Sequence, residues 1–183
     1  VVTCIGNAHS EFFGGLANTI NAKGELVESL QEDALAVLNF DDLNVRALGS
    51  RTSAEILLYG MEGGDVVAEN ITVNPDLKAS FDMRSPWGSS KIQLNVPGKH
   101  NVTNALAAAA VAMHAGAPIS TVASGLESVE ISPLRMETFT TPSGILIIND
   151  AYNANPLSMK AALSSLVATS RKNLVAVLGV MAE

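Results

Sequence analysis

The order strand, loop, helix, strand in the last 40 or so residues constrains the fold of this chain most. Residues 145–149 and 174–178 have the apolar composition of buried strands, and residues 156–170 favour a helix between them. Pro156 suits the first helical position, where its missing N–H costs no hydrogen bond. Two strands joined by a helix of this length favour a parallel sheet, because parallel strands need a crossover connection. We therefore predict the α/β class.

The start of the chain shows the same alternation of strand and helix. Residues 1–6 and 35–39 resemble short buried strands, and residues 42–48 favour a helical turn. Residues 16–30 favour a helix with an apolar stripe at helical spacing. The stripe comprises Leu16, Ile20, Lys23, Val27 and Leu30.

The middle of the chain has a different pattern, with short extended segments separated by turn residues such as Gly63-Gly64 and Asn74-Pro75. The segments are residues 56–59, 66–73, 79–83 and 91–96. Such spacing indicates an antiparallel insert. Two helices are predicted next, over residues 101–115 and 119–129, and we place a domain boundary near Pro133.

Composition narrows the function classes. The chain has 183 residues, of which 48% are hydrophobic, and a net charge of −7, so broad binding to nucleic acid is not expected. The single Cys4 forms no internal disulfide, and no apolar run is long enough to span a membrane. The first residues lack the pattern of a secretory leader, so we expect a cytoplasmic location. The sequence begins and ends within patterns typical of regular structure, so we expect this chain to be a segment of a longer protein.

Two polar clusters lie in the first part of the chain. Residues 6–11 (GNAHSE) follow a predicted strand, where open α/β sheets place ligands, and His9 with Glu11 suits a divalent cation or proton transfer. A polar loop that caps the next helix is the alternative. Lys23 lies on the apolar stripe, so its stem should run inward, which is costly unless the amine is paired or modified. The alternative is a lysine whose stem lies along the helix flank.

Two further clusters precede predicted helices. Residues 98–104 (GKHNVTN) place Asn101 and Asn104 one helical turn apart, where both amides could pair with a purine edge, and the helix N-terminus favours an anion. An ordinary N-cap is the alternative. Residues 149–156 (NDAYNANP) put Asp150 at a strand end, where a carboxylate could hold ribose hydroxyls. A turn built from Asn and Asp is equally good loop chemistry.

Several common motifs are absent from these 183 residues, including G-x-x-x-x-G-K-[ST], G-x-G-x-x-G and zinc-type Cys/His spacings. These 183 residues therefore contain no Gly-rich loop of the kind that cradles phosphates. The residues by themselves indicate an α/β segment whose strand ends could bind a nucleotide.

Taken together, the clusters resemble the Mur ligase family in order and spacing. The matching segments are residues 2–14, 22–25 (AKGE), 37–42 (VLNFDD), 97–110 (PGKHNVTNALAAAA), 135–137 (RME), 148–159 (INDAYNANPLSM) and 177–183 (VLGVMAE). The YNANP string with Ser-Met is the most specific of them and resembles the branch that adds D-alanyl-D-alanine.

The resemblance implies an architecture and a reaction. Residues 1–132 would be the later part of a P-loop-type central ATPase domain with an antiparallel β insert, and residues 133–183 the start of a Rossmann-like C-terminal domain. The reaction implied is an ATP-dependent amide ligation in peptidoglycan precursor synthesis. ATP converts the carboxylate of UDP-N-acetylmuramoyl-tripeptide to an acyl phosphate, which the amine of D-alanyl-D-alanine attacks. The implied cofactors are ATP and Mg²⁺, and the implied whole enzyme is a monomer. Because the chain has no loop to cradle the β- and γ-phosphates of ATP, we expect it to have no ligase activity on its own.

The resemblance also implies roles for individual residues. The expected catalytic and Mg²⁺-binding residues are His9 and Lys23, the latter carboxylated on Nζ to a carbamate. The expected nucleotide-binding residues are His100, Asn101, Asn104, Arg135 and Asp150. Tyr152, Asn153 and Asn155 are expected on the ATP or dipeptide side, and Asn39, Asp41 and Asp42 are interpreted only as turn-formers.

Three positions depart from the family pattern. Leu134 stands where Gly is usual before the Arg, Val180 where Asp is usual, and Ser10 where an apolar residue is usual. Two alternatives follow: a related ligase with another substrate, or a divergent paralogue that binds nucleotide without turnover. The YNANP string argues against the first.

Overall fold

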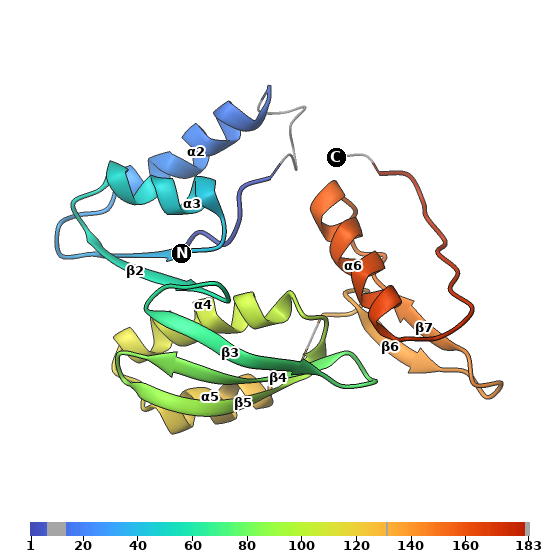
Figure 1. The fold of residues 1–183 in the computed structure, drawn as a ribbon. Coiled ribbons are helices and arrows are strands. Elements are labelled where there is room, and N and C mark those ends of the chain that lie inside the picture. Colours follow the sequence, from blue (N-terminus) through green and yellow to red (C-terminus); the bar gives the residue numbers. More distant parts are fainter. Residues whose placement is uncertain (7–13, 131, 182–183) are drawn as a thin grey trace.

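The computed structural model describes residues 1–6, 14–130 and 132–181. Its elements form two units in chain order (Figure 1). The first comprises α2 (Leu16–Glu28), β1 (Leu35–Asn39), α3 (Leu43–Ala47), the 3₁₀ turn η1 (Leu48–Arg51), β2 (Glu55–Gly60), β3 (Val66–Val73), β4 (Lys78–Ser85), β5 (Gly88–Pro97), α4 (Asn101–His114) and α5 (Ile119–Glu127). The second comprises β6 (Glu137–Thr140), β7 (Leu146–Asn149) and α6 (Pro156–Ala168).

The first unit is built on a mixed five-stranded sheet in the order β1-β2-β3-β4-β5. The pairs β1–β2 and β2–β3 are parallel, whereas β3–β4 and β4–β5 are antiparallel. The predicted α/β class is confirmed. The predicted strand over residues 1–6 is wrong, because that segment makes only a single parallel bridge, from Val2 to Leu38.

The expected antiparallel insert holds for β3 to β5 but not for β2. Tyr59 and Gly60, at the end of β2, pair with Val66 and Val67, at the start of β3, in parallel register. The chain therefore steps sideways through residues 61–65 and continues in the same direction. A reciprocal pair of bonds holds this step: the N–H of Leu58 donates to the Asp65 carboxylate, and the N–H of Asp65 donates to the Leu58 carbonyl, each at 2.8 Å.

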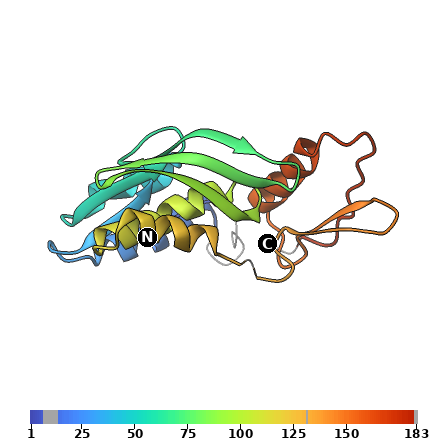
Figure 2. The same ribbon diagram turned by 90° about the horizontal axis from the view of Figure 1, so that it is seen from below.

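Side chains alternate across β1 and so separate two cores. Val37 belongs to the larger core, in which the sheet packs against α4 and α5, as the view from below shows for these two helices (Figure 2). Ala36 and Leu38 point the other way, into a smaller core with residues of α2, α3 and η1. The strand that precedes the candidate site is thus covered on both faces, as expected for a parallel strand.

The second unit is an antiparallel hairpin, β6–β7, followed by α6. Two expectations were wrong here: residues 174–178 form no strand among the described residues, and β7 therefore has no parallel partner beyond α6. β6, which pairs with β7 instead, was not anticipated. Val175 and Val177 in this segment are 78% and 94% exposed. No helix in the described part of the chain has the length and apolarity needed to cross a membrane.

Candidate functional site

Lys23, on α2, reaches across to the N-terminal segment. Its Nζ donates a hydrogen bond to the carbonyl oxygen of Cys4 at 2.8 Å. The residue is exposed, whereas Val27 on the same apolar stripe is only 2% exposed. The amine is therefore held at the edge of the smaller core, accessible to a reactant from solvent.

The polar residues after β1 do more than form a turn. Asn39 Nδ2 donates to the carbonyl of Thr3 at 2.7 Å, and Asp42 Oδ2 accepts from the N–H of Ile5 at 2.8 Å. Asp42 Oδ1 also accepts from two N–H groups in the first turn of α3, at 2.9 and 3.1 Å, and so caps that helix. Sequence reasoning assigned these residues to a turn and missed that they fix the segment that Lys23 contacts.

Two other side chains complete this end of the sheet. The Asp41 carboxylate accepts from the N–H groups of Met61 and Glu62, at 2.7 and 3.0 Å, and so ties the end of β1 to the end of β2. Tyr59 is fully buried and its hydroxyl lies 3.4 Å from the Val2 carbonyl. Burial, with smaller effects of Cys4 and the two Asp carboxylates, raises the pKa of Tyr59 well above its usual range, so the phenol stays a donor.

The start of α4 carries the second cluster. Asn104 Nδ2 donates to Asn101 Oδ1 at 3.1 Å, and Asn101 Nδ2 donates to the Pro97 carbonyl at 2.8 Å, so the two amides share a face as predicted. His100 occupies the N-cap position without a side-chain capping bond. The ordinary N-cap explanation for this cluster is therefore wrong. A Cβ on Gly98 would lie 2.5 Å from the imidazole, so this position needs glycine.

The third cluster belongs to the second unit. The Arg135 guanidinium lies over the Tyr152 ring, 3.9 Å from its centroid, and the Tyr152 N–H donates to the Leu134 carbonyl at 3.0 Å. Asp150 Oδ1 accepts from the N–H of Met136 at 2.9 Å. These bonds join the end of β7 to the segment before β6 and place Arg135, Asp150 and Tyr152 together.

Asn153 and Asn155 shape the loop that leads into α6. Asn153 Oδ1 accepts from the Ala154 N–H at 2.8 Å. Asn155 caps α6, since its Oδ1 accepts from the N–H groups of Leu157 and Ser158 at 3.0 and 2.9 Å, and Ser158 completes a capping box. The amide oxygen of Asn155 is thus already committed to the backbone.

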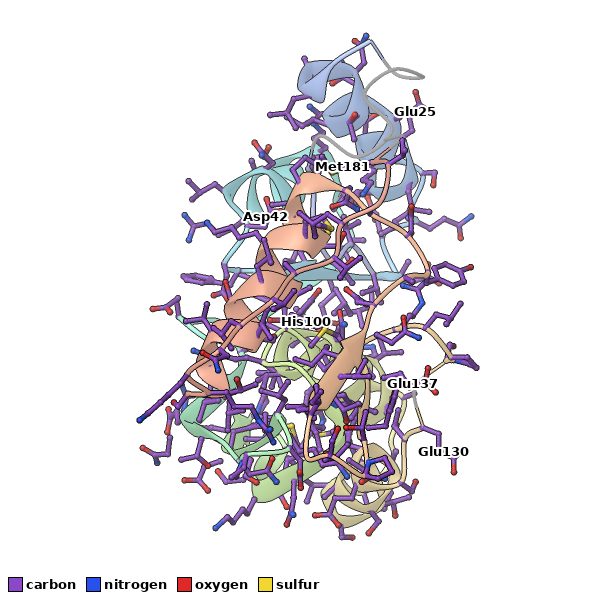
Figure 3. The ribbon with its side chains drawn as sticks, turned by 90° about the vertical axis from the view of Figure 1, so that its right-hand side faces the viewer. Glu25, Asp42, His100, Glu130, Glu137 and Met181 are labelled. Atoms are coloured by element: carbon purple, nitrogen blue, oxygen red, sulfur yellow. The ribbon has the colours of Figure 1, made fainter. Side chains whose placement is uncertain are left out.

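The two units meet at these clusters. The Asp150 carboxylate is close enough to His100 to influence its imidazole, and a Cβ on Gly6 would lie 2.3 Å from Leu157 in the first turn of α6. Figure 3, viewed from the side of the second unit, shows α6 and the hairpin in front of the edge that carries Asp42 and His100. The N-terminal segment, the start of α4 and the loop of residues 150–157 therefore converge.

The charge state of His100 reflects this position. Atoms packed around the ring lower the imidazole pKa of His100 below its ordinary value, because burial disfavours the charged form. The nearby Asp150 carboxylate acts in the opposite direction and is the weaker influence. The residue as a whole is nevertheless exposed to solvent. Near neutral pH a neutral imidazole can both donate and accept a hydrogen bond.

One of the two residues expected to bind a metal ion is not among the described residues. His9 lies outside the described residues. Among the described ones, no three His, Cys, Asp or Glu side chains gather as a metal would require. An unmodified Lys23 is a donor with no lone pair to offer, so it fits a cation only after conversion to an anionic group.

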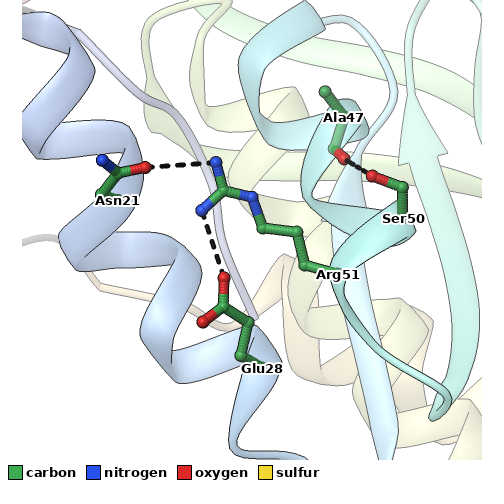
Figure 4. A network of polar contacts seen from close by, with 5 residues as sticks. All are labelled: Asn21, Glu28, Ala47, Ser50 and Arg51. Carbon is green, nitrogen blue, oxygen red and sulfur yellow. Dashed lines mark hydrogen bonds and ion pairs between the residues drawn. The ribbon is translucent and has the colours of Figure 1, made fainter.

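Arg51 links η1 to α2, the helix that carries Lys23 (Figure 4). Its guanidinium reaches from η1 to Glu28 Oε1 at 3.2 Å and Asn21 Oδ1 at 3.3 Å, both on α2. The contact passes over Gly24, where a Cβ would lie 2.5 Å from Arg51 Nη1. The absence of a side chain at Gly24 therefore lets the arginine span the helix.

The fold is that of an α/β protein with polar clusters at its strand ends, and the comparisons name its family. Residues 1–112 match the Mur ligase middle domain, and residues 134–183 match the Mur ligase glutamate ligase domain. The chain belongs to the Mur ligase family. Among curated relatives, the chain is 37% identical over 192 residues to the UDP-N-acetylmuramoyl-tripeptide–D-alanyl-D-alanine ligase of Mycobacterium tuberculosis, and 35% identical over 186 residues to that of Escherichia coli.

Solved structures agree with this assignment. MurF from Acinetobacter baumannii superposes with a TM-score of 0.83 at 34% identity, covering 90% of this chain and 36% of that one. MurF from Thermotoga maritima in complex with ADP gives a TM-score of 0.77 at 25% identity, covering 90% of this chain and 38% of that one. The whole chain aligns with the two curated relatives but spans only 37% and 41% of their lengths.

Proposed function

We propose that this chain is the central part of an ATP-dependent ligase that joins D-alanyl-D-alanine to UDP-N-acetylmuramoyl-tripeptide. Alignment of the whole chain with relatives of that name carries the proposal. In this assignment residues 1–132 belong to the central ATP-binding domain and residues 133–183 begin the C-terminal domain. The enzyme would work in the cytoplasm as a monomer.

The junction between the units is the proposed nucleotide site. His100, Asn101 and Asn104 would contact the base, while Arg135 and Asp150 would approach the ribose and phosphates from the other unit. The electrostatic effect of Asp150 on the imidazole of His100 supports this arrangement, because one ligand could touch both units there. Tyr152 and Asn153 would border the dipeptide, and Asn155 would act by holding the start of α6.

Lys23 is the proposed carbamate. Its position in solvent allows CO₂ to reach Nζ, and the modification replaces a cation with a carboxylate group. That group, together with His9, would hold Mg²⁺, which supplies positive charge against the phosphates and the acyl phosphate. The described residues contribute by orienting Lys23 through the Cys4 carbonyl.

A non-catalytic, nucleotide-binding paralogue is the second candidate. Val180, where the family has Asp, favours it, because an aliphatic side chain there cannot contact the dipeptide amine through a charge. Val180 is 92% exposed.

Phosphate release by the whole gene product distinguishes the two candidates. The assay contains ATP and Mg²⁺, with UDP-N-acetylmuramoyl-tripeptide and D-alanyl-D-alanine added separately and together. We expect release only when both are present. A folded protein that binds nucleotide but releases no phosphate with both substrates would instead support the paralogue.

A further inference from the structure

One peptide group links Lys23 to the residues after β1. The carbonyl oxygen of Cys4, which accepts from Lys23 Nζ, and the N–H of Ile5, which donates to Asp42 Oδ2, belong to the same planar unit. Both N···O distances are 2.8 Å. Because the group is planar and trans, its oxygen and its hydrogen point in opposite directions. Asp42 therefore binds the N–H of the same peptide group whose carbonyl oxygen binds Lys23.

We propose that Asp42 is a positioning residue for Lys23, acting through the peptide group between Cys4 and Ile5. This inference rests on the proposed carbamate. The Asp42 carboxylate fixes the orientation of the peptide plane and polarises it, which makes the Cys4 oxygen a stronger acceptor. Asn39 restrains the preceding peptide by donating to the Thr3 carbonyl at 2.7 Å, so the acceptor is held from two points.

The chemistry of the modification explains why this acceptor matters. A lysine ammonium must first lose a proton, after which the amine lone pair forms a bond to the carbon of CO₂. One C=O bonding pair moves to oxygen, and a second proton leaves the nitrogen. The product, –NH–COO⁻, keeps a single N–H. The Cys4 oxygen already faces that nitrogen, so it can accept this last N–H and fix the direction of the new carboxylate.

The Asp42 carboxylate is well placed for such a role. It is only partly exposed, and its other oxygen is held by the N–H groups of Asn44 and Val45. The side chain therefore has little freedom to turn away from Ile5. Both oxygens act as acceptors, which an amide or hydroxyl side chain cannot reproduce.

The variant Asp42→Asn separates the two tasks of this side chain. Asparagine is a good N-cap, and its one oxygen can still accept from the first turn of α3. Its NH₂ group then faces the N–H of Ile5, two donors without an acceptor. The matched control is Val45→Ala, which removes buried methyl groups from the same helix. It leaves in place the hydrogen bonds that join Lys23, the Cys4–Ile5 peptide group and Asp42.

The experiment measures the carbamate itself, in the whole gene product titrated with ¹³C-bicarbonate and observed by ¹³C NMR. We expect a carbamate signal in the wild type and in Val45→Ala, and none in Lys23→Arg. In Asp42→Asn, the bicarbonate concentration for half-occupancy should rise roughly threefold to tenfold, as expected for one lost charge-assisted hydrogen bond.

The outcomes distinguish failure of the carbamate assignment from failure of the positioning role of Asp42. A wild type without the signal, or Lys23→Arg with it, overturns the carbamate assignment. A signal that depends on Lys23 but titrates identically in Asp42→Asn and the wild type overturns the positioning role alone. An equal shift in Val45→Ala would reduce the effect to general destabilisation and also overturn it. If Asp42→Asn does not fold, Asp42→Ser, whose hydroxyl also caps α3, carries the same test.

Discussion

Leu134 adopts a backbone conformation that suits glycine better than leucine. Its φ is 64°, in the left-handed region, and the residue is 42% exposed. The resemblance to the family led us to expect Gly at this position, so the departure seen in the sequence coincides with a site of backbone strain. The strain lies directly before Arg135, and the Leu134 carbonyl accepts the hydrogen bond that anchors Tyr152.

We therefore expect Leu134→Gly to stabilise the protein. Leucine in this region costs about 1–2 kcal/mol, of which the greater entropy of glycine in the unfolded chain cancels a part. Little apolar burial is lost, so a gain of about 0.5–1 kcal/mol in the free energy of unfolding is expected. Urea unfolding of the wild type and the variant measures it. Leu163→Gly, inside α6 and similarly exposed, should destabilise. A Leu134→Gly protein that unfolds at lower urea would contradict the argument.

At the scale of elements, the contact between η1 and α2 depends on a glycine that sequence pattern alone would count as a weakness of the helix. Alanine at position 24 gains up to about 1 kcal/mol of helix propensity. In the wild type, however, its methyl group would displace the Arg51 guanidinium from Glu28 and Asn21. The ion pair is partly exposed, so its loss should cancel only part of that gain.

A double-mutant cycle tests this balance. Gly24→Ala should stabilise clearly in an Arg51→Ala background and much less in the wild type, with a coupling of about 0.5–1 kcal/mol. Thermal unfolding of the four proteins gives the coupling. Additive effects within error would show that Arg51 does not hold α2 across Gly24.

The same elements show what the sequence could predict. β1, α4 and the start of α6 lie where apolar runs, Pro156 and the helix-forming residues placed them. The parallel step from β2 to β3 was missed, because strand direction depends on pairing partners and leaves no local pattern. In the site, Asn101 and Asn104 share a face because they are three residues apart. The bond from Ile5 to Asp42 joins residues 37 positions apart, so Asp42 was interpreted only as a turn residue.

At the scale of the whole molecule, the pKa of His100 depends on the contact between the two units. Burial lowers its imidazole pKa in the folded state, so the folded protein binds a proton less readily than the unfolded chain. The contribution of this group to stability is complete above the ordinary histidine pKa of about 6.5 and is lost as the pH falls towards the lower folded value. Asp150, from the second unit, supports the imidazolium and limits this loss.

Removing the charge of Asp150 should therefore act on His100 across the junction. In Asp150→Asn the amide oxygen can still accept from the Met136 N–H, so the local turn is kept while the carboxylate charge is lost. We expect the pKa of His100, followed by NMR of its ring protons in the whole gene product, to fall further. Glu137→Gln, which removes a carboxylate from β6 of the same unit, should leave the titration of His100 as it is in the wild type. Because the effect requires the carboxylate to face the imidazole in solution, an unchanged titration in Asp150→Asn would mean that the two units do not meet at this point, and the proposed nucleotide site between them would have to open and close around its ligand.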